Sequence, residues 1–126
     1  MAIEFGKVIP IIRIFSVEKT HEFYMGYLGF KVDWEHRFEP SLPLYMQVSR
    51  GSLLLHLSEH HGDSTPGSKF FVHMTGVREF HAELKAKNYG YLRPGLEKEE
   101  WGATTVTVTD PSMNRIVFAE LDAETA

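Results

Sequence analysis

The stretch EWGATTVTVTDPSMNRIVF (residues 100–118) decides the fold of this chain. Val106 and Val108 alternate with threonines, which predicts a strand with one apolar and one polar face. The pair Asp110-Pro111 then predicts a tight turn, because proline fixes its own φ and an aspartate side chain can accept hydrogen bonds from nearby amides. A second strand is expected after the turn. The stretch therefore predicts a hairpin with a Trp-Gly pair at its entrance.

Length and composition restrict the class of protein. A chain of 126 residues with 43% hydrophobic and 24% charged residues is expected to form one globular domain. It has no cysteine, which excludes disulfides, thiolate metal sites and cysteine nucleophiles. The net charge of −4 disfavours nucleic acid as a partner, because phosphate binding needs clustered lysine and arginine. No apolar run approaches the roughly 20 residues of a membrane span, so we expect a cytoplasmic protein without membrane contact.

The first half of the chain predicts a strand, a helix and three further strands. The apolar segment 7–14 predicts a strand in which Pro10 marks an edge or a hinge. Ser16 is a candidate N-cap for a helix with an amphipathic stripe, and Gly29 follows that helix as glycines do at helix C-termini. Alternating segments then predict strands at about 30–38, 43–49 and 52–59.

The second half repeats this order after a polar loop at residues 60–68. It predicts a strand at 69–75, a helix at 77–88 and strands at about 91–93, 103–109 and 115–121. We therefore expect a single domain over residues 1–126, built from two βαβββ repeats at about 7–59 and 69–121. Each repeat has too little core to stand alone, so the two should pack together. The expected class is α+β, with a curved mixed sheet around a cleft and helices outside.

Several short motifs carry a family resemblance over nearly the whole chain. The W-G pair and the D-P-x-x-N-x-I-x-F segment close the chain, while Pro10, Phe23-Tyr24 and Leu28-Gly29-Phe30 punctuate its start. In this order the chain resembles the vicinal oxygen chelate superfamily, which includes glyoxalase I, ring-cleaving dioxygenases and fosfomycin-resistance enzymes. Its N-terminal motifs resemble the bleomycin-resistance branch.

The resemblance also implies where a metal-dependent member would hold its divalent ion. Those positions fall near Ile9, at His56, near 69–71 and at Val117, and His56 is the one good ligand among them. A shift of a few residues would add His73, which leaves an atypical metal site open. We expect no metal, no cofactor and no catalytic residue.

The candidate ligand-binding residues lie on the predicted strands. Three leucines share one face of the strand at 52–59, so His56 and Ser58 are expected to face the cleft. Aromatic residues on strands or at a strand entrance complete the predicted set, namely Trp34, Phe38, Tyr45 and Trp101. Other aromatic residues follow the helix stripes or the inner strand faces and are expected in the core, namely Phe23, Tyr24, Phe80 and Phe118.

The resemblance implies a protein that binds a bleomycin-type antibiotic and sequesters it without chemistry. Bleomycin carries a flat bithiazole and a cationic tail, which aromatic rings and nearby carboxylates such as Asp33 and Glu35 would attract. The resemblance further implies a homodimer, with clefts at the dimer interface and the first strand exchanged at Pro10. Two alternatives stay open, a metal-dependent glyoxalase-like or dioxygenase-like enzyme and a binder of an unrelated small metabolite.

Overall fold

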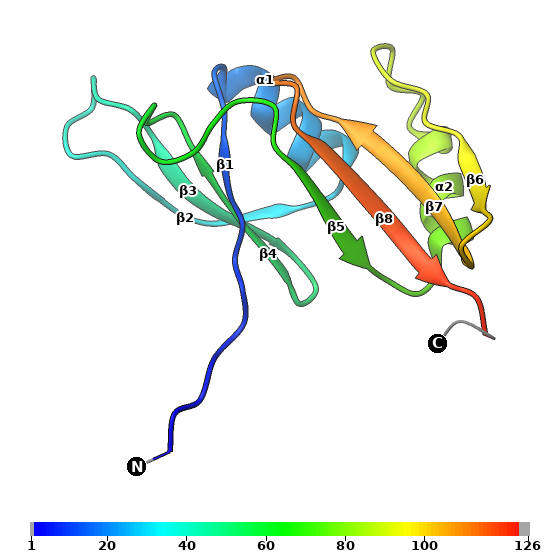
Figure 1. Ribbon diagram of the computed structural model, residues 1–126. Coiled ribbons are helices and arrows are strands. Elements are labelled where there is room, and N and C mark those ends of the chain that lie inside the picture. Colours follow the sequence, from blue (N-terminus) through cyan, green and yellow to red (C-terminus); the bar gives the residue numbers. More distant parts are fainter. Residues whose placement is uncertain (1, 124–126) are drawn as a thin grey trace.

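The computed structural model describes residues 2–123 and contains two successive βαβββ units (Figure 1). The first unit consists of β1 (Ile11–Arg13), α1 (Val17–His21), the π-helical η1 (Glu22–Tyr27), β2 (Lys31–His36), β3 (Tyr45–Arg50) and β4 (Leu53–Ser58). The second unit consists of β5 (Lys69–His73), α2 (Val77–Ala86), β6 (Leu96–Glu99), β7 (Ala103–Thr109) and β8 (Arg115–Leu121). The predicted repeat order is confirmed.

The strands form two four-stranded sheets of identical topology. The first sheet has the order β1-β4-β3-β2 and the second sheet the order β5-β8-β7-β6. In each sheet the first strand pairs in parallel with the last strand of its unit, and the other pairings are antiparallel. The α+β class is confirmed, and the mixed sheet is divided into two halves, one for each unit.

The hairpin predicted from residues 100–118 is present as β7 and β8. The turn closes when the amide of Asp110 donates to the carbonyl of Asn114 over 2.8 Å. Val106 and Val108 are fully buried while Thr107 is exposed, as the alternation predicts. Met113 in the turn has a φ of 71°, a left-handed conformation that a non-glycine residue rarely adopts.

The first helix begins where the sequence predicts but changes its winding midway. Ser16 caps it by accepting a hydrogen bond from the amide of Lys19 over 3.1 Å. From Glu22 the backbone widens into η1, where the amide of Leu28 reaches back five residues to the carbonyl of Phe23 over 2.9 Å. The wider turn accompanies the burial of four side chains that lie as adjacent pairs in the sequence, Phe23, Tyr24, Tyr27 and Leu28.

The first strand is shorter than predicted and is preceded by an extended arm. Pairing is limited to Ile11–Arg13, and Figure 1 shows the chain before β1 extending away from the sheets toward the N-terminus. Apolar side chains of this arm are largely exposed, with Ile3, Phe5 and Val8 at 84%, 95% and 90%. A proline has no amide to donate, so Pro10 contributes only its carbonyl, which accepts from the amide of His56 over 3.0 Å. The predicted strand at 7–14 was therefore too long.

Two further boundaries differ from the prediction. The short strand expected at 91–93 is absent, and the sheet is instead extended by β6 at Leu96–Glu99, beyond Pro94 and Gly95. Proline cannot donate to a ladder, which explains why pairing with β7 begins only after it. In the first unit β2 ends at His36, so Phe38 lies in the following loop and not on the strand.

The two units share one apolar core. Their inward side chains form a single buried cluster, with contributions from both sheets and both helical segments, including Ile12, Phe23, Tyr24, Leu55, Leu57, Val77, Phe80, Leu84, Val106, Ile116 and Phe118. The four aromatic residues predicted to be in the core are all buried. Packing of the two units against each other supplies the core that each unit lacks alone.

A buried polar network joins the units at one end. The Tyr24 hydroxyl donates to Asp110 Oδ2 over 2.8 Å, and Asp110 Oδ1 accepts from the amides of Ser112 and Asn114. Asn114 Nδ2 in turn donates to the carbonyl of Arg13 over 2.7 Å. The turn between β7 and β8 is thereby fastened to the helix and the first strand of the other unit.

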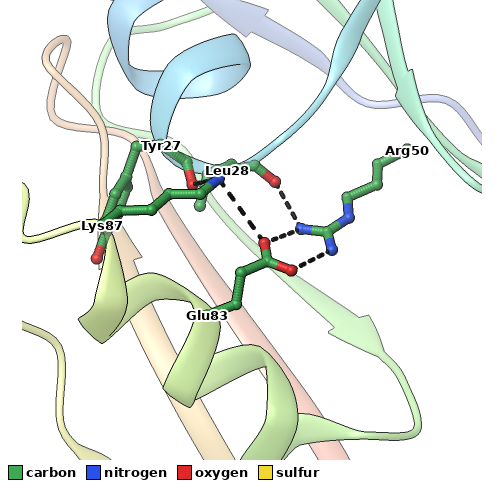
Figure 2. A network of polar contacts seen from close by, with 5 residues as sticks. All are labelled: Tyr27, Leu28, Arg50, Glu83 and Lys87. Atoms are coloured by element: carbon green, nitrogen blue, oxygen red, sulfur yellow. Dashed lines mark hydrogen bonds and ion pairs between the residues drawn. The ribbon is translucent and has the colours of Figure 1, made fainter.

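A second network joins the units at the surface (Figure 2). Arg50, at the end of β3, forms a bidentate ion pair with Glu83 of α2. Its Nη1 donates to Oε2 over 2.7 Å and its Nη2 to Oε1 over 2.8 Å. Arg50 also donates to the carbonyl of Leu28, and Lys87 donates to the carbonyl of Tyr27, each over 2.8 Å. These bonds tie the C-terminal end of η1, where carbonyls lack helical partners, to α2.

Candidate functional site

Three predicted residues meet on the face of the first sheet that points away from the core. Trp34 and Tyr45 stack with ring centroids 5.9 Å apart and planes inclined by 10°. His56 contacts both rings edge-on, at 5.3 Å from Trp34 and 5.2 Å from Tyr45. We call these three residues the Trp34 patch. Trp34 is 43% exposed, so the patch offers an aromatic surface to a ligand.

A β-bulge in β2 produces this arrangement. The pairing of β2 with β3 shifts register between Val32 and Trp34, which leaves Asp33 as the extra residue. The shift places Trp34 opposite Gln47, and Gln47 lies opposite His56 on β4. Side chains of directly opposed residues project from the same face, so the three form one row across the sheet.

A chain of hydrogen bonds fixes the polar edge of the Trp34 patch. Gln47 Nε2 donates to Asp33 Oδ2 over 3.1 Å, so Gln47 Oε1 is left to accept from His56 Nε2 at 3.0 Å. The proton of the neutral imidazole therefore resides on Nε2, and Nδ1 accepts from the Tyr45 hydroxyl at 2.6 Å. Both ring nitrogens of His56 are engaged, and Tyr45 retains oxygen lone pairs that can accept from a ligand.

Two groups in this hydrogen-bond chain, Asp33 and Tyr45, have shifted pKa values because of their surroundings. Hydrogen bonds from Gln47 and then Ser49 lower the pKa of Asp33, which keeps the carboxylate charged and an obligate acceptor. Burial is the main cause that raises the pKa of Tyr45, and the charge of Asp63 adds to it. Tyr45 is thus a hydroxyl and not a phenolate at physiological pH.

The remaining three predicted residues do not add to the aromatic surface of the Trp34 patch, although Ser58 lies directly opposite Tyr45. Ser58 is fully buried, donates to Asp63 Oδ2 over 2.6 Å and accepts from the amide of His60, so it holds a loop and has no surface for a ligand. Phe38 is 76% exposed in the loop after β2 and packs edge-on against His36 at 5.0 Å. Neither is part of the row formed by Trp34, Gln47 and His56.

Trp101 belongs to a second aromatic surface on the other sheet. Its ring lies 6.0 Å from Phe71, which in turn lies 5.0 Å from His73, both on β5. Phe71 and His73 point outward because Phe70 and Val72, which alternate with them, pack toward the core. We call these residues the Trp101 patch. Phe71 was not among the predicted site residues, although the alternation of apolar residues at 69–73 was a signal for it.

The cavities do not coincide with the predicted cleft residues. A groove of about 840 Å³ lies between the units beside the Arg50–Glu83 ion pair, with an apolar floor that includes Phe30, Phe80 and Phe118. A smaller cavity of about 330 Å³ lies between α2 and the loop at 88–94. Neither is lined by any of the six predicted ligand-binding residues. The Trp34 and Trp101 patches are open faces within one chain.

The donor residues do not fit a metal ion of the family type. Among residues 2–123, no group of three histidine, aspartate or glutamate side chains lies close enough to hold a metal ion. Of the positions that the resemblance implies, Val117 on β8 cannot ligate, and His56 already uses both ring nitrogens in hydrogen bonds. We therefore derive no chemical step through a metal ion. In the same part of the chain, no helix has the length and apolar character needed to cross a membrane.

Comparison with known proteins establishes the family. The family model described as glyoxalase superfamily protein matches residues 1–124, and the chain belongs to this superfamily. The assignment made from the sequence motifs is confirmed. No curated protein matches the chain.

Solved structures share the fold at low sequence identity. A bleomycin-binding protein complexed with bleomycin superposes with a TM-score of 0.72 at 21% identity, covering 94% of this chain and 100% of that chain. TnmS3, an antibiotic binding protein from Streptomyces sp. CB03234, gives a TM-score of 0.73 at 18% identity, covering 96% and 100%. The bleomycin-binding protein of bleomycin-producing Streptomyces verticillus, complexed with copper(II)-bleomycin, gives 0.68 at 24% identity, covering 93% and 97%. These likenesses establish the fold.

Proposed function

We propose that this protein binds a small, flat molecule on its aromatic surfaces and sequesters it without chemistry, as a bleomycin-type antibiotic-binding protein. The observation that carries the proposal is the exposed Trp34–Tyr45 stack, 43% open at Trp34 and held in place by the hydrogen bonds of His56. A planar ligand could extend this stack with little rearrangement. The solved antibiotic-binding proteins of the same fold support the choice of ligand class.

The arrangement of side chains gives little support to catalysis. The one histidine of the patch has both nitrogens committed, so it is not a free general base. Tyr45 donates its proton to His56 and has a raised pKa, which disfavours a phenolate nucleophile. A metal-dependent enzyme of this superfamily would need ligands that the described positions lack, and metal analysis of purified protein would distinguish it.

A closed binding site would need a second copy of the chain. The two aromatic patches lie on different sheets and are open within one chain, so the Trp34 patch of one subunit could face the Trp101 patch of its partner. The arm at residues 2–10 exposes Ile3, Phe5 and Val8. This apolar surface favours exchange of the N-terminal segment between two subunits, with Pro10 as the hinge. We propose a homodimer with this exchange, and a cytoplasmic location.

The proposal is tested by calorimetric titration of the chelator-treated protein with metal-free and copper-bound bleomycin. A submicromolar dissociation constant, about −8 kcal/mol or better, at one drug per chain would support sequestration. Loss of one stacking partner in Trp34→Ala should weaken binding at least about fivefold, because aromatic contacts contribute about 1 kcal/mol beyond burial. The matched control is Tyr91→Ala, since Tyr91 is 75% exposed and outside both patches. Absence of heat with either form of the drug would remove bleomycin as the ligand.

A further inference from the structure

Arg13 carries a positive charge that the fold does not neutralise. Its Nε is buried and has no hydrogen-bond partner among residues 2–123. Within the same residues its guanidinium forms no ion pair, although five ion pairs of other lysine or arginine side chains are present. The guanidinium lies 4.6 Å from the centroid of the Phe15 ring, which is its described partner. A buried donor without an acceptor is unfavourable, and the guanidinium as a whole has no described carboxylate to pair with.

A second arginine lines the same pocket. Arg13 and Arg37 border a cavity of about 340 Å³ together with Phe15, Leu42 and Glu59. Arg37 is already compensated, because its Nη1 donates to the carbonyl of Leu42 over 2.6 Å and lies 3.5 Å from Glu59 Oε1. Glu59 Oε1 also accepts from the amide of Leu44 over 2.8 Å. Two arginines and one carboxylate leave the lining with one net positive charge, and Arg13 is the arginine that has no ion-pair partner among residues 2–123.

Arg13, which borders this pocket, lies on the same sheet face as the Trp34 patch. Arg13 on β1 pairs with Ser58 on β4, and Ser58 pairs with Tyr45 on β3, so the three form one row across the sheet. Two strand spacings place Arg13 about 10 Å from Tyr45. Asp63 lies beside this row, where it accepts from the Ser58 hydroxyl and its charge contributes to the raised pKa of Tyr45. One small ligand could therefore reach both the aromatic stack and the arginine.

We propose that Arg13, with Arg37 beside it, forms an anion-binding subsite for the carboxylate of an aromatic acid whose ring stacks on Trp34. This inference rests on the proposed function of the Trp34 patch as a surface for flat ligands. A carboxylate supplies one negative charge, which matches the one net positive charge of the lining, and a guanidinium fork binds its two oxygens side by side. A neutral aromatic amide lacks the negative charge that Arg13 would attract, so the acid is expected to bind more tightly than the amide.

The subsite can be tested without an aromatic ligand. Sodium acetate is titrated into uniformly ¹⁵N-labelled protein at constant ionic strength with chloride as the counter-ion, and the arginine Nε–H signals are followed. Saturable shifts of Arg13, together with slower exchange of its Nε proton, are the expected result. Arg78, exposed on α2, serves as the internal control and should not respond. Equal, non-saturating shifts of both arginines would overturn the subsite.

A matched ligand pair tests the coupling to the aromatic surface. Naphthoate and its neutral amide, naphthamide, share one ring system and differ in charge. Wild-type protein should bind the acid at least about tenfold more tightly than the amide, because hydrogen bonds to a charged group are stronger than those to a neutral group. Arg13→Gln should remove this preference and leave the affinity for naphthamide unchanged, whereas Arg78→Gln should keep it.

The outcomes separate the two proposals. Equal affinity of the wild-type protein for acid and amide would overturn the anion subsite while leaving the flat-ligand surface supported. A preference that survives in Arg13→Gln would also overturn the assignment to Arg13. Failure of both probes to bind, combined with a saturable acetate response at Arg13, would contradict the aromatic surface and with it the link between subsite and stack.

Discussion

Tyr24 and Asp110, 86 positions apart in the chain, share a buried hydrogen bond of 2.8 Å that joins the two units. Tyr24 is fully buried, and its pKa is raised well above the usual value, chiefly by burial and further by the charge of Asp110. The same carboxylate holds the turn of the hairpin that the sequence predicts most clearly. A bond between a helix of one unit and a turn of the other couples the stability of both.

We expect Tyr24→Phe to lower the free energy of unfolding by about 2 kcal/mol. The change removes one donor from a buried carboxylate and leaves the packing of the ring intact, and hydrogen bonds to charged groups contribute about that much. Urea denaturation followed by circular dichroism measures the effect. Tyr91→Phe is the control, since this tyrosine is 75% exposed. Equal stability of the two variants would show that water replaces the lost donor.

Alkaline pH should destabilise the protein through the same tyrosine. Because the folded pKa of Tyr24 lies above the unfolded value, the unfolded chain loses its proton first as the pH rises. The stability is complete below about pH 10 and is lost progressively above it as the pH approaches the folded pKa. Denaturation midpoints measured between about pH 8 and about pH 11 should fall more steeply for the wild type than for Tyr24→Phe. Parallel curves would contradict this prediction.

The ion pair of Arg50 with Glu83 should contribute modestly and in a salt-dependent way. Hydrogen bonds from Arg50 lower the pKa of Glu83, but both side chains are more than a third exposed, at 40% and 36%. Glu83→Gln should therefore lower stability by at most about 1 kcal/mol, and the effect should shrink in concentrated salt. The contribution is present above the unfolded pKa of a glutamate and is lost as the pH falls through the lower folded value. Glu97→Gln, on exposed β6, is the control. A loss that persists in concentrated salt would contradict a screened surface pair.

The hydrogen-bond chain of the Trp34 patch predicts one tautomer of His56. Long-range ¹H–¹⁵N correlation spectra of the neutral imidazole should show the proton on Nε2, because Gln47 offers it an acceptor while Tyr45 donates to Nδ1. Tyr45→Phe should release Nδ1 and yield a tautomer mixture. His21, which lies 3.6 Å from Glu35 at the surface, provides an unrelated reference signal in both proteins. A proton on Nδ1 in the wild type would contradict the direction that we assign to both hydrogen bonds of His56.

The exposed arm predicts a change of assembly when it is removed. Deletion of residues 2–9 should convert the proposed homodimer into a monomer, because Ile3, Phe5 and Val8 would supply the apolar contact with the partner. Sedimentation velocity over a range of protein concentrations measures the mass. Lys7→Gln, which keeps the apolar residues, should remain dimeric. An unchanged mass after the deletion would place the dimer contact elsewhere or exclude exchange.

Local patterns in the sequence predicted the elements with inward faces well. Alternation at Val106 and Val108, the Ser16 cap and the leucine face of β4 each involve residues near in sequence, and each is present in the structure. The predictions were wrong where contacts between distant segments, or the missing amide proton of a proline, determine the local structure. The first strand stops short beside Pro10, and the last turns of the first helix widen to bury paired aromatic residues.

The candidate site was likewise predicted only in part from local patterns in the sequence. The sequence selected Trp34, Tyr45 and His56, and their rings do meet. It placed Trp101 in the same group, although that residue lies with Phe71 on the other sheet. Neither Gln47 nor Arg13 was predicted as a site residue, because an amide or an arginine on a strand carries no pattern that reveals its neighbours.

The sequence by itself determined which residues form strands and which side chains point inward, because the two-residue period of a strand is a local property. Only the tertiary structure decided which strands lie side by side and in what register. The bulge at Asp33 sets Trp34 opposite Gln47, and the parallel pairing of β1 with β4 brings Arg13 into line with Ser58 and Tyr45. These relationships depend on backbone pairing between distant segments, and they define what the face of the first sheet can bind.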